Sequence, residues 1–230
     1  MTGRFTPLNF RNGNARSHSL THMALIDISR SLSPSTAVWP GDQAVEWTWT
    51  TRVGNPDASV NLGAIELSTH AGSHVDAPYH VSEEGRTTDE LPLSVFVGRV
   101  QVVEVGDASS LRPEHVDGVS AERVLFKTQA SSLSDDEWPN SVAAFEPETI
   151  RCLAAKDVVL VGTDAPSVDP LDSTSLPAHH ALIDAGIVNL EALRLNDVSP
   201  GTYHLMAFPL KISGADAAPV RAVLQDRNPD

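Results

Sequence analysis

The chain has 230 residues, 41% of them apolar, and this size and composition predict one domain of ordinary globular make-up. A formal net charge of −14 argues against nucleic acid or an anionic membrane as a main partner. No apolar run approaches the roughly 18 residues of a membrane span, and a single cysteine, Cys152, excludes a disulfide within the chain.

The first 22 residues differ in character from the rest. They carry three arginines and no acidic residue, and they lack the apolar centre of a secretory signal. We expect residues 1–22 to form a disordered extension and residues 23–230 to form a single domain. Because Met23 opens the first strand-like run, both Met1 and Met23 are candidates for the natural start.

Strand-like runs dominate the first half of the chain. Val45, Trp47 and Trp49 alternate with polar neighbours, which is the period-two pattern of a half-buried strand. The runs over 98–105 and 123–128 are rich in β-branched residues, as buried strands are. Further strands are predicted at 24–29 and 60–70, and a short helix at 112–119.

Helices and strands alternate more clearly in the second half. An amphipathic helix is predicted over 146–157, with an apolar strand after it over 158–164. Two short helices are predicted over 178–186 and 189–195, the first ended by Gly186. Closing strands are expected at 203–212 and 220–224. The sequence therefore predicts an α/β domain with a mixed, curled (barrel-like) sheet and outer helices.

The segment HAGSHVDAPYH, which begins at His70, gathers metal-type ligands where neither helix nor strand can run undisturbed. Gly72 permits a turn closed to other residues, and Pro78 forbids a helix. In an extended stretch His74 and Asp76 point the same way, and the Gly72 turn brings His70, at the end of its strand, onto that face. Imidazole and carboxylate suit zinc, manganese or iron(II), and three protein ligands leave room for water.

His80 closes the same segment. It could be a further ligand or an acid/base group, and we favour the acid/base interpretation. A lone loop histidine is usually structural or solvated. That explanation weakens sharply for three histidines and an aspartate within eleven residues of a chain with only nine histidines.

A second cluster lies downstream, with His179 and His180 near the exposed start of one predicted helix and Glu191 in the next. Taken alone, this cluster is weak evidence for a metal site, because adjacent histidines at a helix start are usually surface residues and Glu191 fits a solvated face. Together with the first cluster, His179 and Glu191 supply what a second metal needs. His180 has no assigned role.

With both clusters in view, the chain resembles the cyclase-like metal-dependent hydrolases, and within them the bacterial kynurenine formamidase (arylformamidase) branch. The resemblance covers nearly all of the chain from Met23 onward. It rests on the segments DIS, VWPGD, HAGSHVDAPYH, GTDAPSVDP, AHH and FPLKISGADAAPVRAVL, in that order. The third segment fits the family pattern H-x-G-[TS]-H-x-D-x-P-x-H, which is specific.

This resemblance implies roles for the site residues. Two divalent ions, expected to be zinc, would be bridged by Asp76 and Glu191. The full set of metal ligands that it implies is His70, His74, Asp76, His179 and Glu191. His80 would donate and accept the proton, and Trp39 would contact an aromatic substrate ring, although a tryptophan taken alone is more often a core or interface residue.

The implied reaction is hydrolysis of N-formyl-L-kynurenine to L-kynurenine and formate, by water that the metals activate, in a cytoplasmic homodimer with a swivelling β/β/α type of fold. No G-x-S-x-G elbow is present, so a serine hydrolase is excluded. Thr174 and Pro177 stand where that branch often carries a lysine and an acidic residue, which leaves the exact substrate open. The alternatives are a sister amide hydrolase, such as an isatin-hydrolase-like enzyme, and a metal-binding protein without catalysis.

Overall fold

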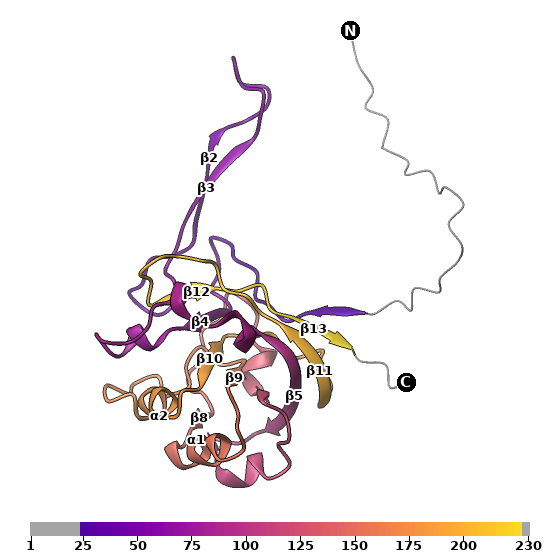
Figure 1. Ribbon diagram of the computed structural model, residues 1–230. Coiled ribbons are helices and arrows are strands. Elements are labelled where there is room, and N and C mark those ends of the chain that lie inside the picture. Colours follow the sequence, from indigo (N-terminus) through magenta and orange to yellow (C-terminus); the bar gives the residue numbers. More distant parts are fainter. Residues whose placement is uncertain (1–23, 227–230) are drawn as a thin grey trace.

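A computed structural model describes residues 24–226 and shows a nine-stranded sheet that curls around one core, with two α-helices packed on one side (Figure 1). The predicted extension at 1–22 and Met23 lie outside the described residues. No helix between residues 24 and 226 combines the length and apolarity needed to cross a membrane. The helices are α1 (Pro147–Ala154) and α2 (Pro177–Ala185).

The sheet is mixed, as the sequence predicts. Its strands, from one edge to the other, are β1 (Leu25–Asp27), β13 (Val223–Asp226), β11 (Gly201–Met206), β5 (Val97–Gly106), β7 (Arg123–Thr128), β9 (Leu160–Thr163), β10 (Val188–Glu191), β4 (His74–Asp76) and β12 (Ala217–Pro219). The central run β5–β7–β9–β10 is parallel, and all other neighbours are antiparallel. The predicted fold class is confirmed.

Short elements connect these strands. Two small sheets stand apart from the main one, made of β2 (Glu46–Thr51) with β3 (Leu62–Glu66), and of β6 (Ser110–Leu111) with β8 (Ala144–Phe145). Five 3₁₀ turns are η1 (Pro78–His80), η2 (Thr88–Glu90), η3 (Leu93–Phe96), η4 (Pro113–Val116) and η5 (Gln129–Ser132).

The core has two apolar layers because strand side chains alternate between the faces of the sheet. On β7, Val124 and Phe126 join the cluster that α1 and α2 cover, while Leu125 joins the cluster on the opposite face. The continuous apolar run of this strand, buried on both faces, is what a parallel central strand requires. The sequence identified it for that reason.

The hairpin of β2 and β3 corrects one prediction. It projects away from the body of the molecule (Figure 1). Only Val45 at its base is buried, whereas Trp47 is 49% and Trp49 44% exposed. The expected half-buried strand is therefore wrong in its burial, although right in its position. Alternation predicts which residues share a face, but no element between residues 24 and 226 covers that face.

The prediction of the second short helix, over 189–195, is also wrong. Residues 188–191 form β10, inserted between β9 and β4, and Ala192 leaves the strand with a φ of 52°. Leu190 and Leu193 fit a helical period, but over so short a window the same residues also fit a buried strand. The tertiary pairing with two neighbours decides between the two, and it places Glu191 at a strand end.

Candidate metal centre

The register of β4 against its neighbours brings the first ligand-type side chains together. His74 lies opposite Glu191 on β10, and Asp76 lies opposite Asn189. His74 and Asp76 are two residues apart and share one face, as expected for a strand. His74 Nε2 is 3.3 Å from Asp76 Oδ1 and 3.6 Å from Glu191 Oε2. All three residues are buried.

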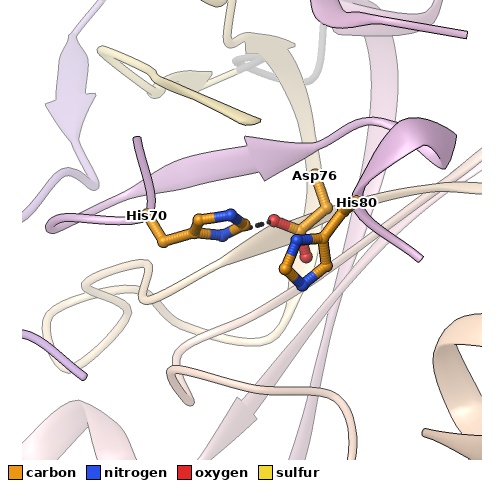
Figure 2. A group of neighbouring side chains, drawn as sticks. All are labelled: His70, Asp76 and His80. Carbon is orange, nitrogen blue, oxygen red and sulfur yellow. Dashed lines mark ion pairs between the residues drawn. The ribbon is translucent and has the colours of Figure 1, made fainter. Parts of the chain in front are cut away.

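His70 reaches this cluster from a turn. β3 ends at Glu66, so His70 does not end a strand, contrary to the prediction. The Gly72 turn is confirmed: its φ is +63°, and a Cβ there would lie 2.7 Å from Leu32 Cδ2. The turn directs the His70 ring back over β4, where Nδ1 lies 3.0 Å from Asp76 Oδ1 (Figure 2).

His179 enters from the first turn of α2, which begins at Pro177, one residue before the predicted helix. Its expected exposure is wrong, because His179 is buried. Asp169 accepts hydrogen bonds from the Ala178 and His179 backbone N–H groups, and it also lies 2.7 Å from His179 Nδ1. The ring therefore turns inward, with Nε2 3.4 Å from Asp76 Oδ2 and 3.5 Å from Glu191 Oε1.

The three inward-facing rings share one arrangement. One nitrogen of each is held by an oxygen outside the cluster: Asp216 for His70, the Gly72 carbonyl for His74 and Asp169 for His179. The other nitrogen faces the carboxylates of Asp76 or Glu191. This is the outer-shell pattern of metal-ligating histidines, in which the remote nitrogen is fixed so that the near one can bind.

Two observations test whether a cation fits between these groups. Among the described residues, His74 Nε2 and Asp76 Oδ1 are buried without a hydrogen-bond partner. Burial opposes the charged form of His70, but the nearby carboxylates of Asp216 and Asp76 outweigh burial and raise the pKa of His70 to about 10.

Burial likewise opposes the charge of His179, yet Asp169, Asp76 and Glu191 raise its pKa to about 12. The carboxylates thus favour positive charge within the cluster, and a divalent cation bound by neutral rings would supply it in place of the protons. The residues fit a metal centre.

His80 borders the cluster without being buried in it. It ends η1, whose geometry follows from Pro78 at the first position, and its side chain is 30% exposed. The ring lies 4.3 Å from that of His70, centroid to centroid, beside Asp76 (Figure 2). Partial burial lowers the pKa of His80. Since His70, Asp76 and His80 could also hold an ion together, both predicted interpretations of His80 remain open.

A pocket of about 270 Å³ opens onto the cluster and is lined by four of its members, His70, His74, His179 and Glu191, and by His80. The pocket is also lined by Trp39, which is 38% exposed, and by Trp138, with ring centroids 5.4 Å apart in an edge-to-face contact. The structure therefore brings all the predicted site residues to one place. An apolar wall facing polar groups is the usual form of a small-molecule site.

Four residues of the site were not predicted. Asn189 donates to Asp76 Oδ2 and Glu191 Oε1, at 2.8 and 3.1 Å, and fixes both carboxylates. Asp169 and Asp216 lie in segments that carried the family resemblance, GTDAPSVDP and ISGADAAP, which was the available signal. Trp138 lies in a polar loop, where the sequence offered no signal of a site beyond the residue type.

Comparisons with known proteins agree with this geometry. The family model described as putative cyclase matches residues 26–170. The kynurenine formamidase of Salinibacter ruber is 65% identical over 208 residues, which cover 89% of this chain and 98% of that protein.

Two solved structures share the fold. A potential metal-dependent hydrolase with cyclase activity has a TM-score of 0.77 at 29% identity, covering 90% of this chain and 100% of its own. An isatin hydrolase bound to the product analogue thioisatinate has a TM-score of 0.76 at 22% identity, with 89% and 92% covered, which shows the fold alone. On the family match and the identity to the formamidase, this chain belongs to the putative cyclase family.

Proposed function

We propose that this chain is a metal-dependent amidohydrolase that cleaves N-formyl-L-kynurenine to L-kynurenine and formate. The observation that carries the proposal is the convergence of three histidines and two carboxylates at the base of a pocket with a tryptophan wall. The 65% identity to a kynurenine formamidase supports the substrate. Residues 23–230 would act as one hydrolase domain, and a cytoplasmic location stays a prediction.

The ligand set suits two divalent ions, and zinc is the proposed metal. His70 and His74 would bind one ion and His179 the other, while Asp76 and Glu191 would bridge them. Such a pair, when bound, lowers the pKa of a water toward neutrality and polarises a carbonyl oxygen. Asn189 holds both bridging carboxylates in place, so their geometry does not depend on the ions alone.

The chain's own residues would carry out the remaining steps. Trp39 and Trp138 would hold the aryl ring, which places the formyl group over the cluster. His80 would take the proton of the attacking water and give it to the aryl nitrogen as the C–N bond breaks, because an unprotonated arylamide is a poor leaving group. Its position beside the cluster and its lowered pKa suit a neutral base near pH 7.

The function is tested by metal content and formate release measured together. We expect about two zinc ions per chain and formate release from N-formylkynurenine, with little release from an aliphatic formamide of similar size, which has no ring to pack against the tryptophans. A strong chelator should abolish turnover, and added zinc should restore it.

Turnover of isatin in preference to formylkynurenine would favour the sister hydrolase. Metal binding without formate release from any formanilide would favour a non-catalytic protein, against which His80 beside a complete ligand set argues.

We also propose a homodimer in which the hairpin of β2 and β3 contacts the second copy. Trp47, Trp49 and Ile65 share one face of the hairpin and are 44–50% exposed. On the opposite face β2 carries Glu46 and Thr48, which pair with Glu66 and Ala64 on β3. A free two-stranded hairpin is marginally stable in water, and an exposed apolar face of this kind marks an interface.

Sedimentation of the purified protein checks the dimer. Trp47→Glu and Trp49→Glu place a charge on the apolar face and should shift the dimer toward monomer. Thr48→Glu places the same charge on the opposite face of the same strand and should leave the dimer intact. A wild-type monomer at micromolar concentration would contradict the proposal.

A further inference from the structure

Asp216 belongs to neither of the two ligand clusters predicted from the sequence, yet it touches residues of the candidate site. Its Oδ2 lies 2.9 Å from His70 Nε2 and 3.5 Å from His80 Nδ1. Its Oδ1 accepts a hydrogen bond of 3.0 Å from the Thr69 hydroxyl. Both oxygens are thus used, and one carboxylate reaches both the His70 and the His80 ring.

The backbone fixes Asp216 firmly beside β4. Ala77 donates its N–H to the Asp216 carbonyl at 2.8 Å, and Thr88 donates to the preceding Ala215 carbonyl at 3.0 Å. The next residue, Ala217, pairs with Asp76 in the antiparallel register of β12 on β4. Asp216 is therefore held by the same strand that carries the central carboxylate of the cluster.

This placement decides which nitrogen of His70 is free. A metal-binding histidine must be neutral. When the neutral His70 ring donates its Nε2 proton to Asp216, its Nδ1 is unprotonated, and Nδ1 is the atom that faces Asp76 at 3.0 Å. Asp169 does the same for His179, but it forms no hydrogen bond or ion pair with His80. Of the carboxylates outside the cluster in the part of the chain that the structure describes, Asp216 alone connects a ligand-type histidine with the proposed acid/base.

We propose that Asp216 is a positioning residue that holds the His70 ring with Nδ1 toward the metal centre and restrains the His80 ring beside it. The proposal rests on the proposed metal-dependent function. Asp216 acts by hydrogen bonding, so an uncharged acceptor of the same shape should preserve most of its effect on the His70 ring. Outer-shell partners of this kind typically change metal affinity or activity by about 10–100-fold.

Zinc affinity provides a readout that does not depend on turnover. The metal-free full chain is titrated with zinc against a chromophoric chelator, for wild type, Asp216→Ala and Asp216→Asn. We expect Asp216→Ala to weaken one of two sites by about 10–100-fold while the other changes little. Asp216→Asn keeps an oxygen for the His70 N–H and should recover most of that affinity.

Kinetics at saturating zinc give the second readout. Asp216→Ala should lower kcat for formylkynurenine with KM nearly unchanged, because the aryl ring is held by Trp39 and Trp138 on other segments. The matched control is Asp89→Asn. Asp89, in η2, accepts a hydrogen bond from the N–H of Gly214, two residues before Asp216, but it touches no histidine. The zinc affinities of Asp89→Asn should therefore equal those of wild type.

The outcomes separate the two proposals. A wild-type chain that binds no zinc tightly overturns the metal-dependent function itself. A wild type with two tight sites and an Asp216→Ala variant with the same two sites overturns the role of Asp216 alone. Equal losses in Asp216→Asn and Asp216→Ala, or in Asp89→Asn, also overturn it, because orientation by a hydrogen bond predicts neither. Thermal unfolding of each metal-free variant verifies that the chains compared are folded.

Discussion

Replacement of Asp76 by alanine should remove both divalent ions from the protein and reduce formate release to background. Asp76 is the carboxylate that all three inward-facing histidines approach: His70, His74 and His179 each place a nitrogen within 3.4 Å of one of its oxygens. Loss of a carboxylate shared by two ions removes a ligand from each. Asn189, whose amide donates to Asp76 and to Glu191, would also lose one of its two acceptors.

Metal analysis of the purified variant after dialysis against zinc checks this result. Chelator-treated wild type is the control, because it isolates the effect of losing metal from that of losing the side chain. Added zinc should raise the thermal midpoint of the treated wild type, since an ion that binds only the folded chain stabilises it by mass action. It should leave the midpoint of Asp76→Ala unchanged. Two zinc ions retained in the variant would disprove the bridging role.

The first ligand cluster could be predicted from sequence because its geometry is local. His74 and Asp76 sit two apart on one short strand, and a single glycine turn returns His70 to them, so period and turn chemistry suffice. The same reasoning located the central strands, where apolar runs of β-branched residues indicate burial on both faces.

The second cluster was harder because it depends on pairing between distant segments. Glu191 was expected on a helix, and only the insertion of β10 beside β4 brings it opposite His74. His179 was expected at an exposed helix start, and its burial follows from Asp169, ten residues earlier, which caps that helix and holds the ring. Neither contact leaves a periodic signal in the sequence.

The exposed hairpin shows a different limit. Val45, Trp47 and Trp49 alternate as a half-buried strand should, and the strand exists. What covers its apolar face is not encoded in the alternation, so a single chain can satisfy the pattern and still leave both tryptophans in water. A strand face that packs on the core and one that packs on a partner have the same alternating sequence pattern.

His80→Ala should keep both ions and the fold and should lower kcat for formylkynurenine by about 10²–10⁴-fold, the usual contribution of a positioned acid/base group. The side chain is 30% exposed and lies at the edge of the cluster, so its removal leaves no cavity in the core. Metal analysis separates the two interpretations of this residue. Loss of one ion in His80→Ala would make it a ligand.

The leaving group provides the sharper test of its role. If His80 protonates the departing aryl nitrogen, the defect of His80→Ala should shrink on a formyl ester such as 4-nitrophenyl formate, whose phenolate leaves without a proton. His180→Ala is the matched control, since it removes an exposed imidazole next to His179 and should turn over both substrates at wild-type rates. An equal defect on amide and ester would place His80 in the activation of water, because that step is common to both substrates and proton delivery to the leaving group is not.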